Sequence, residues 1–308
     1  MANGWRALRR WGRRMTRRIA ASAFVWLACA AGAPWPVRLL PVGVACAAEE
    51  PHPVQHPDLP ASEDAAKDRL NRSPRHGEFV SVDVEGTPVR TWIVYPERKD
   101  KAPVVVVIHE IFGLSDWVRA VADQLAAEGF IAVAPDLLSG KGPAGGGTDA
   151  FATRDDAVKA VSGLARGEVI ARLNAVRSYA LALPSARGAS ATVGFCWGGS
   201  TSFAYAVAQP QLDAAVVYYG TAPEDVATLA TVRAPVLGLY GGDDARVDAT
   251  IEATQAAMRT HGKSYEPHVF AGAGHGFLRA QGGQDGANLR AVEQAWPMTL
   301  SFLRAHLR

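Results

Sequence analysis

The sequence predicts one α/β domain over residues 77–308, with a mostly parallel, doubly wound sheet of about eight strands and helices on both faces. Three observations support this. Val104–Ile108 is a continuous β-branched run, which is typical of a strand buried on both faces. Helical and strand patterns alternate from there to the C-terminus, and the connections are long enough for parallel pairing. No internal repeat or second core is visible, so we expect a single domain.

The domain is expected to open with a hairpin, because Phe79–Val84 and Val89–Tyr95 alternate apolar and polar residues across a Glu-Gly-Thr turn. After the buried strand, Asp116–Glu128 has apolar residues at helical spacing and is followed by a glycine that ends the helix. The next strand is Phe130–Ala134. The glycine-rich loop Gly142–Gly147 lacks the Lys-Ser/Thr of a phosphate-binding loop, so no nucleotide and no other cofactor is expected.

The second half continues the alternation of strands and helices. The remaining strands are expected at Ala191–Phe195, Ala214–Tyr219, Val236–Tyr240 and Pro267–Phe270, and the helices at Glu168–Leu183, Trp197–Ala208, around Asp248–Thr260 and at Ala287–His306.

Residues 1–47 are predicted to be a cleaved export signal. They hold eight arginines and no acidic residue, a mostly apolar stretch at Ile19–Ala33, and an A-x-A cleavage pattern around Cys46. The apolar stretch is short for a membrane span, although an uncleaved anchor is an alternative. The arginine pair after Thr16 leaves twin-arginine export open, and Gly43 speaks against a lipid-anchored form. The mature protein is therefore expected in the periplasm or outside the cell.

Residues 48–76 are rich in proline, charge and histidine, and are predicted to be a tether. His52 and His56 could bind a metal, but such segments are usually solvated, so no metal is expected there. Of three cysteines, Cys29 and Cys46 fall in the leader, so the mature chain would keep only Cys196. A lone thiol in an oxidising compartment is either buried and inert or has a function.

Charge and composition exclude several classes of protein. The chain is 48% hydrophobic and 20% charged, which is ordinary globular composition. Its net charge of +2 becomes −6 without residues 1–47, because these carry eight arginines and no acid. A mildly acidic body argues against nucleic-acid binding. It also has no apolar run long enough to span a membrane.

Candidate active groups are expected directly after the strands, since sites in such sheets lie at the carboxyl ends of the strands. Gly194-Phe195-Cys196-Trp197-Gly198 is a G-x-C-x-G motif between a strand and a helix, a nucleophile elbow with sulfur in place of the serine oxygen. The strained turn needs small neighbours, and the helix N-terminus favours a thiolate. The alternative is a buried cysteine in a glycine-rich turn.

An acid and a base follow in the expected chain order. Asp243 and Asp244 come after one predicted strand, and His275 comes after the next. Gly-Asp turns and single histidines are common by themselves, but the order nucleophile, acid, base predicts a hydrolase. The loop that begins His109-Glu110 should supply a second oxyanion-hole N–H. No second histidine follows at helical spacing, so no metal is expected in this loop.

The segments HEIFGL, GFCWGG, GGDDARV and GAGHGF resemble the dienelactone hydrolase family, which are carboxymethylenebutenolidase-like α/β hydrolases, over about residues 77–308. The feature most specific to this family is the combination of a cysteine in the elbow with the Glu of HEIFG. The resemblance implies the α/β-hydrolase fold, Cys196 as nucleophile, His275 as base and Asp244 as the acid that orients it. Asp244 is preferred to Asp243 because GGDD matches the family's Gly-Gly-x-Asp.

The resemblance also implies that Glu110 contacts the thiol at rest and exchanges partners when substrate binds. It implies that the backbone N–H groups of Ile111 and Trp197 form the oxyanion hole. In relatives that take dienelactone, two arginines hold the substrate carboxylate. Arg279 matches one of them in position, and Arg154 is the candidate for the other.

The sequence thus predicts a cysteine hydrolase of small lactones or activated carboxylic esters, including carboxylate-bearing ones. Two alternatives are a non-catalytic binding protein of the same fold, since fold alone does not imply activity, and a thiol redox sensor. The absence of a resolving cysteine in the mature chain speaks against the sensor.

Overall fold

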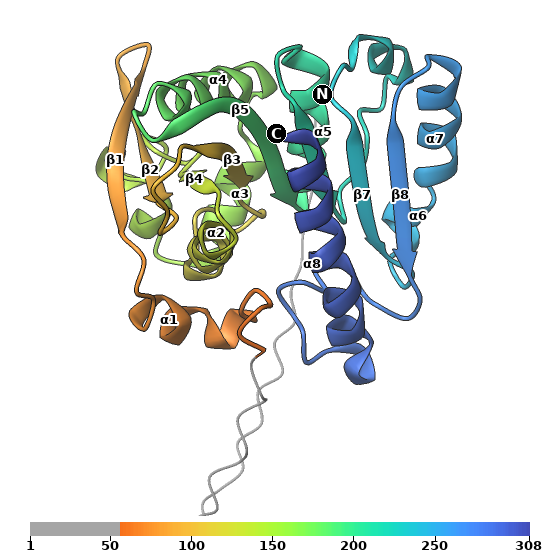
Figure 1. Ribbon diagram of the computed structural model, residues 1–308, viewed down its shortest axis with the longest axis horizontal. Helices are drawn as coiled ribbons and strands as arrows, with labels where there is room; N and C mark the ends of the chain where they lie inside the picture. Colours follow the sequence, from red (N-terminus) through yellow and green to blue (C-terminus); the bar gives the residue numbers. More distant parts are fainter. Residues whose placement is uncertain (1–55) are drawn as a thin grey trace, which may run out of the picture. The chain divides into compact units, whose positions relative to one another are not determined.

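The computed structural model describes residues 56–308. These residues contain one eight-stranded sheet, with the strands in the order β1-β2-β4-β3-β5-β6-β7-β8 (Figure 1). β2 runs antiparallel to both β1 and β4, and all other neighbours are parallel. This confirms the predicted mostly parallel sheet. The strands are β1 (Gly77–Val84), β2 (Thr87–Val94), β3 (Ala102–Ile108), β4 (Ile131–Pro135), β5 (Ala186–Phe195), β6 (Ala214–Tyr218), β7 (Val236–Gly241) and β8 (Tyr265–Phe270).

The predicted long helices are found within two residues of their expected bounds, except that the expected helix around 248–260 is divided in two. Short 3-10 turns lie at 143–145, 148–150, 226–231 and 284–286. The α-helices are α1 (Glu63–Asn71), α2 (Asp116–Ala127), α3 (Arg154–Ser162), α4 (Arg166–Leu181), α5 (Trp197–Ala208), α6 (Ala245–Asp248), α7 (Ile251–Thr260) and α8 (Ala287–His306).

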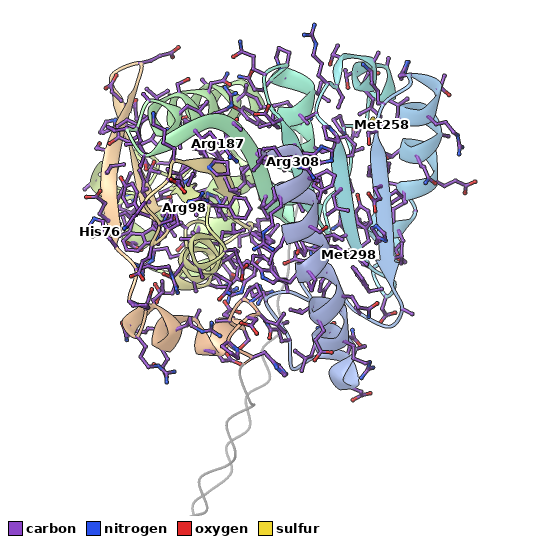
Figure 2. The ribbon with its side chains drawn as sticks, in the orientation of Figure 1. His76, Arg98, Arg187, Met258, Met298 and Arg308 are labelled. Atoms are coloured by element: carbon purple, nitrogen blue, oxygen red, sulfur yellow. The ribbon has the colours of Figure 1, made fainter. Side chains whose placement is uncertain are left out.

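The sheet separates two hydrophobic clusters, one against each face. Strand β3 is buried throughout and contributes alternate residues to both, because successive side chains of a strand point to opposite faces. One cluster includes residues of α1, α2 and α8, and the other includes residues of α4, α5 and α7. Figure 2 labels Met298 on α8, which packs on the first cluster, and Met258 on α7, which is buried in the second. Both faces of the sheet are therefore covered, as predicted.

The prediction of a tether over residues 48–76 is wrong for the part that the structure describes. Glu63–Asn71 form α1, which packs on α2 and buries Ala66 completely. The indole N–H of Trp117 in α2 donates a hydrogen bond of 3.0 Å to the carbonyl oxygen of Ala61. The buried face of α1 consists largely of alanines, so it leaves little apolar periodicity in a charged sequence.

Helix α3 was also not predicted, although its N-terminus has a capping signal. The Thr153 hydroxyl accepts a hydrogen bond of 3.1 Å from the backbone N–H of Asp156, as an N-cap residue does. The predicted export signal over residues 1–47 lies outside the described residues, as do Cys29, Cys46 and His52. Among residues 56–308, no helix is long and apolar enough to cross a membrane.

Candidate active site

Cys196 lies in a strained turn between β5 and α5. Its backbone φ is 55° and its ψ is −117°, a conformation that non-glycine residues rarely adopt. Two glycines permit it: a Cβ on Gly194 would clash with the Gly198 carbonyl, and a Cβ on Gly198 would clash with the carbonyl of His109. The G-x-C-x-G segment therefore has the backbone of a nucleophile elbow, and it presents the sulfur at the carboxyl end of the sheet.

The Cys196 side chain is a free, partly buried thiol. Burial raises its pKa above the ordinary value, and the nearby carboxylate of Glu110 raises it further. The backbone N–H groups of Trp197 and Ile111 act on the sulfur in the opposite direction, by hydrogen bonding. At neutral pH the resting group is thus a thiol, and the two N–H groups assigned to the oxyanion hole are both directed toward it.

His275, after β8, and Asp244, after β7, form a hydrogen-bonded pair at the carboxyl end of the sheet. Nδ1 of His275 lies 2.5 Å from Oδ2 of Asp244. The carboxylate can only accept, so Nδ1 carries the proton and Nε2 is the nitrogen with a free lone pair. Asp244 is buried, whereas Asp243 is exposed. The structure therefore places Asp244, and not its neighbour, against the histidine.

Glu110 is buried beside the thiol and pairs with Arg279. Its Oε2 lies 2.7 Å from Nε of Arg279, although the N–H is not aligned as in a hydrogen bond. Burial raises the pKa of Glu110 to about 7, because desolvation of the carboxylate outweighs the attraction of Arg279. A carboxyl that titrates near neutral pH thus lies within electrostatic range of the candidate nucleophile.

His109 fixes the peptide that carries one of the two N–H groups. Its Nε2 accepts a hydrogen bond of 3.3 Å from the backbone of Leu137, so Nδ1 is the protonated nitrogen and donates to the carbonyl oxygen of Glu110 at 2.7 Å. In a trans peptide the carbonyl and the N–H point in opposite directions. The histidine therefore orients the Ile111 N–H toward the sulfur. Burial lowers the pKa of His109, so the ring stays neutral.

Tyr219 belongs to the site and was missed in the sequence. It follows β6 directly, has a φ of 40°, and is fully buried. Its ring packs edge-on against His275 with the centroids 5.2 Å apart. Its buried hydroxyl has no aligned hydrogen-bond partner, but it lies close enough to the carboxylate of Glu110 to lower the pKa of that group slightly. The signal that could have found it is its place after a strand, the same rule that located the other residues.

The two arginines are brought together, but around a carboxylate of the chain itself. Arg154 at the start of α3 and Arg279 in the loop after β8 both pair with Glu63 of α1. The guanidinium of Arg154 also lies over the ring of Phe112, 3.6 Å from its centroid. The resemblance to the family implied that both guanidiniums hold a substrate carboxylate. In the structure Glu63, from the segment assigned to a tether, provides that carboxylate.

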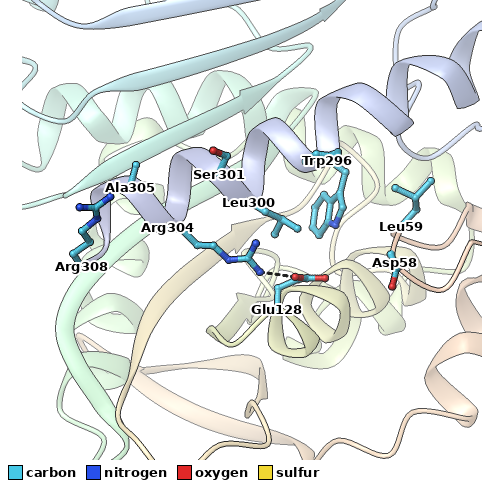
Figure 3. A pocket seen from close by; sticks show the side chains of 10 residues that line it. Asp58, Leu59, Glu128, Trp296, Leu300, Ser301, Arg304, Ala305 and Arg308 are labelled. Atoms are coloured by element: carbon cyan, nitrogen blue, oxygen red, sulfur yellow. Dashed lines mark hydrogen bonds and ion pairs between the residues drawn. The ribbon is translucent and has the colours of Figure 1, made fainter.

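Two cavities differ in their position relative to the candidate residues, and one of them borders the elbow. One of about 650 Å³ lies against α8 and the end of α2, with Arg304 paired to Glu128 (Figure 3). It contains none of the candidate residues, so its size does not make it the active site. A cavity of about 320 Å³ is lined by Trp197 and Ser200 of α5 together with residues of α4, and therefore borders the elbow. Within the described part of the chain, no group of three His, Cys, Asp or Glu side chains is arranged to hold a metal.

Comparison with known proteins identifies the family of the chain. Residues 89–307 match the dienelactone hydrolase family. The protein named "Putative carboxymethylenebutenolidase" of Escherichia coli K12 is 33% identical over 243 residues, which cover 74% of this chain and 86% of the relative. Its namesake from Salmonella typhimurium LT2 is 35% identical over 220 residues, 65% of this chain and 77% of the relative. The crystal structure titled "Putative Dienelactone Hydrolase" from Klebsiella pneumoniae has 28% identity and a TM-score of 0.67, and the match covers 75% of this chain and 98% of that one. The fold is the α/β-hydrolase fold, as predicted, and the chain belongs to the dienelactone hydrolase family.

Proposed function

We propose that this hydrolase cleaves lactones and activated carboxylic esters through Cys196. The observation that carries the proposal is the set of three groups that follow β5, β8 and β7 at the carboxyl end of the sheet: a thiol in a strained elbow, a histidine, and a buried aspartate bonded to that histidine. The names of the relatives support the same class of substrate.

The proposed reaction has two halves, formation of an acyl-enzyme and its hydrolysis, and the same groups act in both. Nε2 of His275 takes the thiol proton while Sγ of Cys196 attacks the carbonyl carbon, and the carbonyl electrons move to the oxygen. The N–H groups of Ile111 and Trp197 donate to that oxyanion. The C–O bond to the leaving alkoxide then breaks, and His275 returns the proton to it. Water attacks the thioester in the same way, and its proton passes through His275 to the released thiolate.

Glu110 is proposed to keep the thiol protonated until substrate binds. Its negative charge raises the pKa of Cys196, and at rest it is held by Arg279. A thiol resists oxidation and alkylation better than a thiolate does, which would suit the single cysteine of the exported chain that the sequence predicts.

Replacing Glu110 by glutamine is expected to speed alkylation of Cys196 by iodoacetamide at pH 8. Removal of the negative charge, and release of Arg279 from it, both lower the pKa of the thiol. A pKa lower by one gives up to about tenfold more thiolate below the pKa. The measurement is the alkylation rate against pH, with the exposed Asp243→Asn variant as control. Equal or slower alkylation of the Glu110 variant would contradict this role.

The function itself is tested by hydrolysis of neutral aryl esters, lactones and thioesters by the purified protein, with mass spectrometry of the quenched reaction. We expect turnover of at least one class and an acyl group on the peptide that contains Cys196. A binding protein would retain the ester unchanged. A redox sensor would show peroxide-dependent oxidation of Cys196 without turnover.

A further inference from the structure

Glu63 connects the two arginines of the site through its two carboxylate oxygens. Oε1 lies 3.0 Å from Nη2 of Arg154, and Oε2 lies 2.5 Å from Nη1 of Arg279. The three residues come from three separate segments: α1, the start of α3, and the loop that also carries His275. Each arginine thus already has a carboxylate partner, which it contacts through one guanidinium nitrogen.

The charges of this cluster balance where Glu110 is ionised, at pH values above its pKa of about 7. Arg279 is shared between Glu63 and Glu110, so the two guanidiniums face two carboxylates. Burial acts to lower the pKa of Arg279, but the two carboxylates outweigh it and raise the pKa. With Glu63 in place, an incoming carboxylate meets no uncompensated positive charge in this cluster. Without the Glu63 carboxylate, the two guanidiniums would face only Glu110, and one positive charge would have no partner in the cluster.

Glu63 is held in place by its backbone as well as by its side chain. Its backbone N–H donates to the carbonyl oxygen of Arg279 at 3.0 Å. The side-chain amide of Gln281, on the same loop, donates to the carbonyl oxygen of Pro60 at 2.8 Å. Together with the burial of Ala66 against the core, these contacts fix the N-terminus of α1 to the loop of the catalytic histidine. The carboxylate is therefore part of the folded site.

We propose that Glu63 is a specificity-determining residue: it occupies the arginine pair and makes the enzyme select uncharged esters and lactones over those that carry a carboxylate near the scissile bond. A substrate carboxylate would have to displace Glu63 from two charged contacts or lie beside it as a like charge. This inference rests on the proposed hydrolase function and names the class of substrate for that site.

The test is made at pH 8, where Glu110 is ionised, with paired p-nitrophenyl esters of equal chain length, one neutral and one with a terminal carboxylate: butyrate against succinate, valerate against glutarate, and hexanoate against adipate. The three pairs differ in the distance between the ester carbonyl and the terminal group, so that one of them can match the distance from the thiol to the arginines. For the wild-type enzyme we expect kcat/KM to be about threefold to tenfold higher on the neutral ester, since the side chains of Glu63 and Arg154 are partly exposed and solvent weakens their charged contacts. Glu63→Gln should raise kcat/KM on the best-fitting anionic ester by about threefold to tenfold and change kcat/KM on the neutral ester by less than about twofold.

The matched control is Asp64→Asn, which removes one negative charge from the next residue of α1, an exposed side chain. This variant should leave the ratio of kcat/KM between the neutral and the anionic ester unchanged. If Asp64→Asn and Glu63→Gln changed that ratio equally, the effect would come from long-range charge alone, and the proposal would be overturned. Preference of the wild-type enzyme for the anionic esters would also overturn it, and this outcome needs no variant to fold.

Binding separates this inference from the proposed function. Glutarate is titrated calorimetrically into Cys196→Ala and into the double variant Cys196→Ala/Glu63→Gln, neither of which needs to turn over. Tighter binding to the double variant supports the proposal, and equal affinity overturns it. Absence of turnover of every neutral ester by the wild-type enzyme would instead count against the hydrolase function.

Discussion

Replacing Cys196 by alanine is expected to lower kcat/KM for a neutral aryl ester by at least about 10⁴-fold, because the step that forms the acyl-enzyme loses its nucleophile. His275→Ala should lower it by about 10²–10⁴-fold, the usual contribution of a general base. The measurement is steady-state hydrolysis, with stoichiometric alkylation of Cys196 as an independent way to remove the nucleophile.

The double variant is the internal control for a shared mechanism. Groups that act as one unit do not contribute additively, so Cys196→Ala/His275→Ala should be little slower than Cys196→Ala alone. Losses that multiply would mean that the two residues act in separate steps. Full activity in Cys196→Ala would rule out the cysteine mechanism.

Asp244→Asn is expected to lower kcat by about 10³–10⁴-fold while the fold is retained. An amide can donate to Nδ1 of His275, which would place the proton on Nε2 and remove the base that deprotonates the thiol. The structure supplies the matched control in the neighbouring residue. Asp243 is exposed and does not touch the histidine, so Asp243→Asn should stay within about twofold of the wild-type rate, as surface substitutions usually do. A larger loss in Asp243→Asn than in Asp244→Asn would reassign the acid.

The elements that could be predicted are those whose pattern carries strong local signals. Val104–Ile108 can be assigned as a buried strand because five consecutive β-branched residues suit few other structures. Helix α1 could not be assigned in this way. It buries two alanines, and most of its other residues are polar or charged, so its stability comes from docking on α2 rather than from its own sequence.

The positions of Cys196, Asp244 and His275 could be predicted because of a topological rule. Parallel strands bring their carboxyl ends to one edge of the sheet, so residues that follow different strands converge without any local signal of contact. The same rule covers Tyr219, but an aromatic residue at a strand end is usually part of the core, and its contact with Glu110 needed the structure.

The sequence by itself determined the order and spacing of the groups around the thiol, and with them the fold and the family. Only the tertiary structure showed that Glu63 pairs with both arginines. Glu63 is separated from Arg279 by 216 positions, and the bond between them forms because α1 docks beside the loop of His275. No periodicity or motif in the sequence predicts an ion pair between distant segments. Such a pair depends on how the two segments pack, and not on the residues next to either partner in the chain. A pair of arginines that the sequence assigned to substrate is therefore occupied by the protein itself.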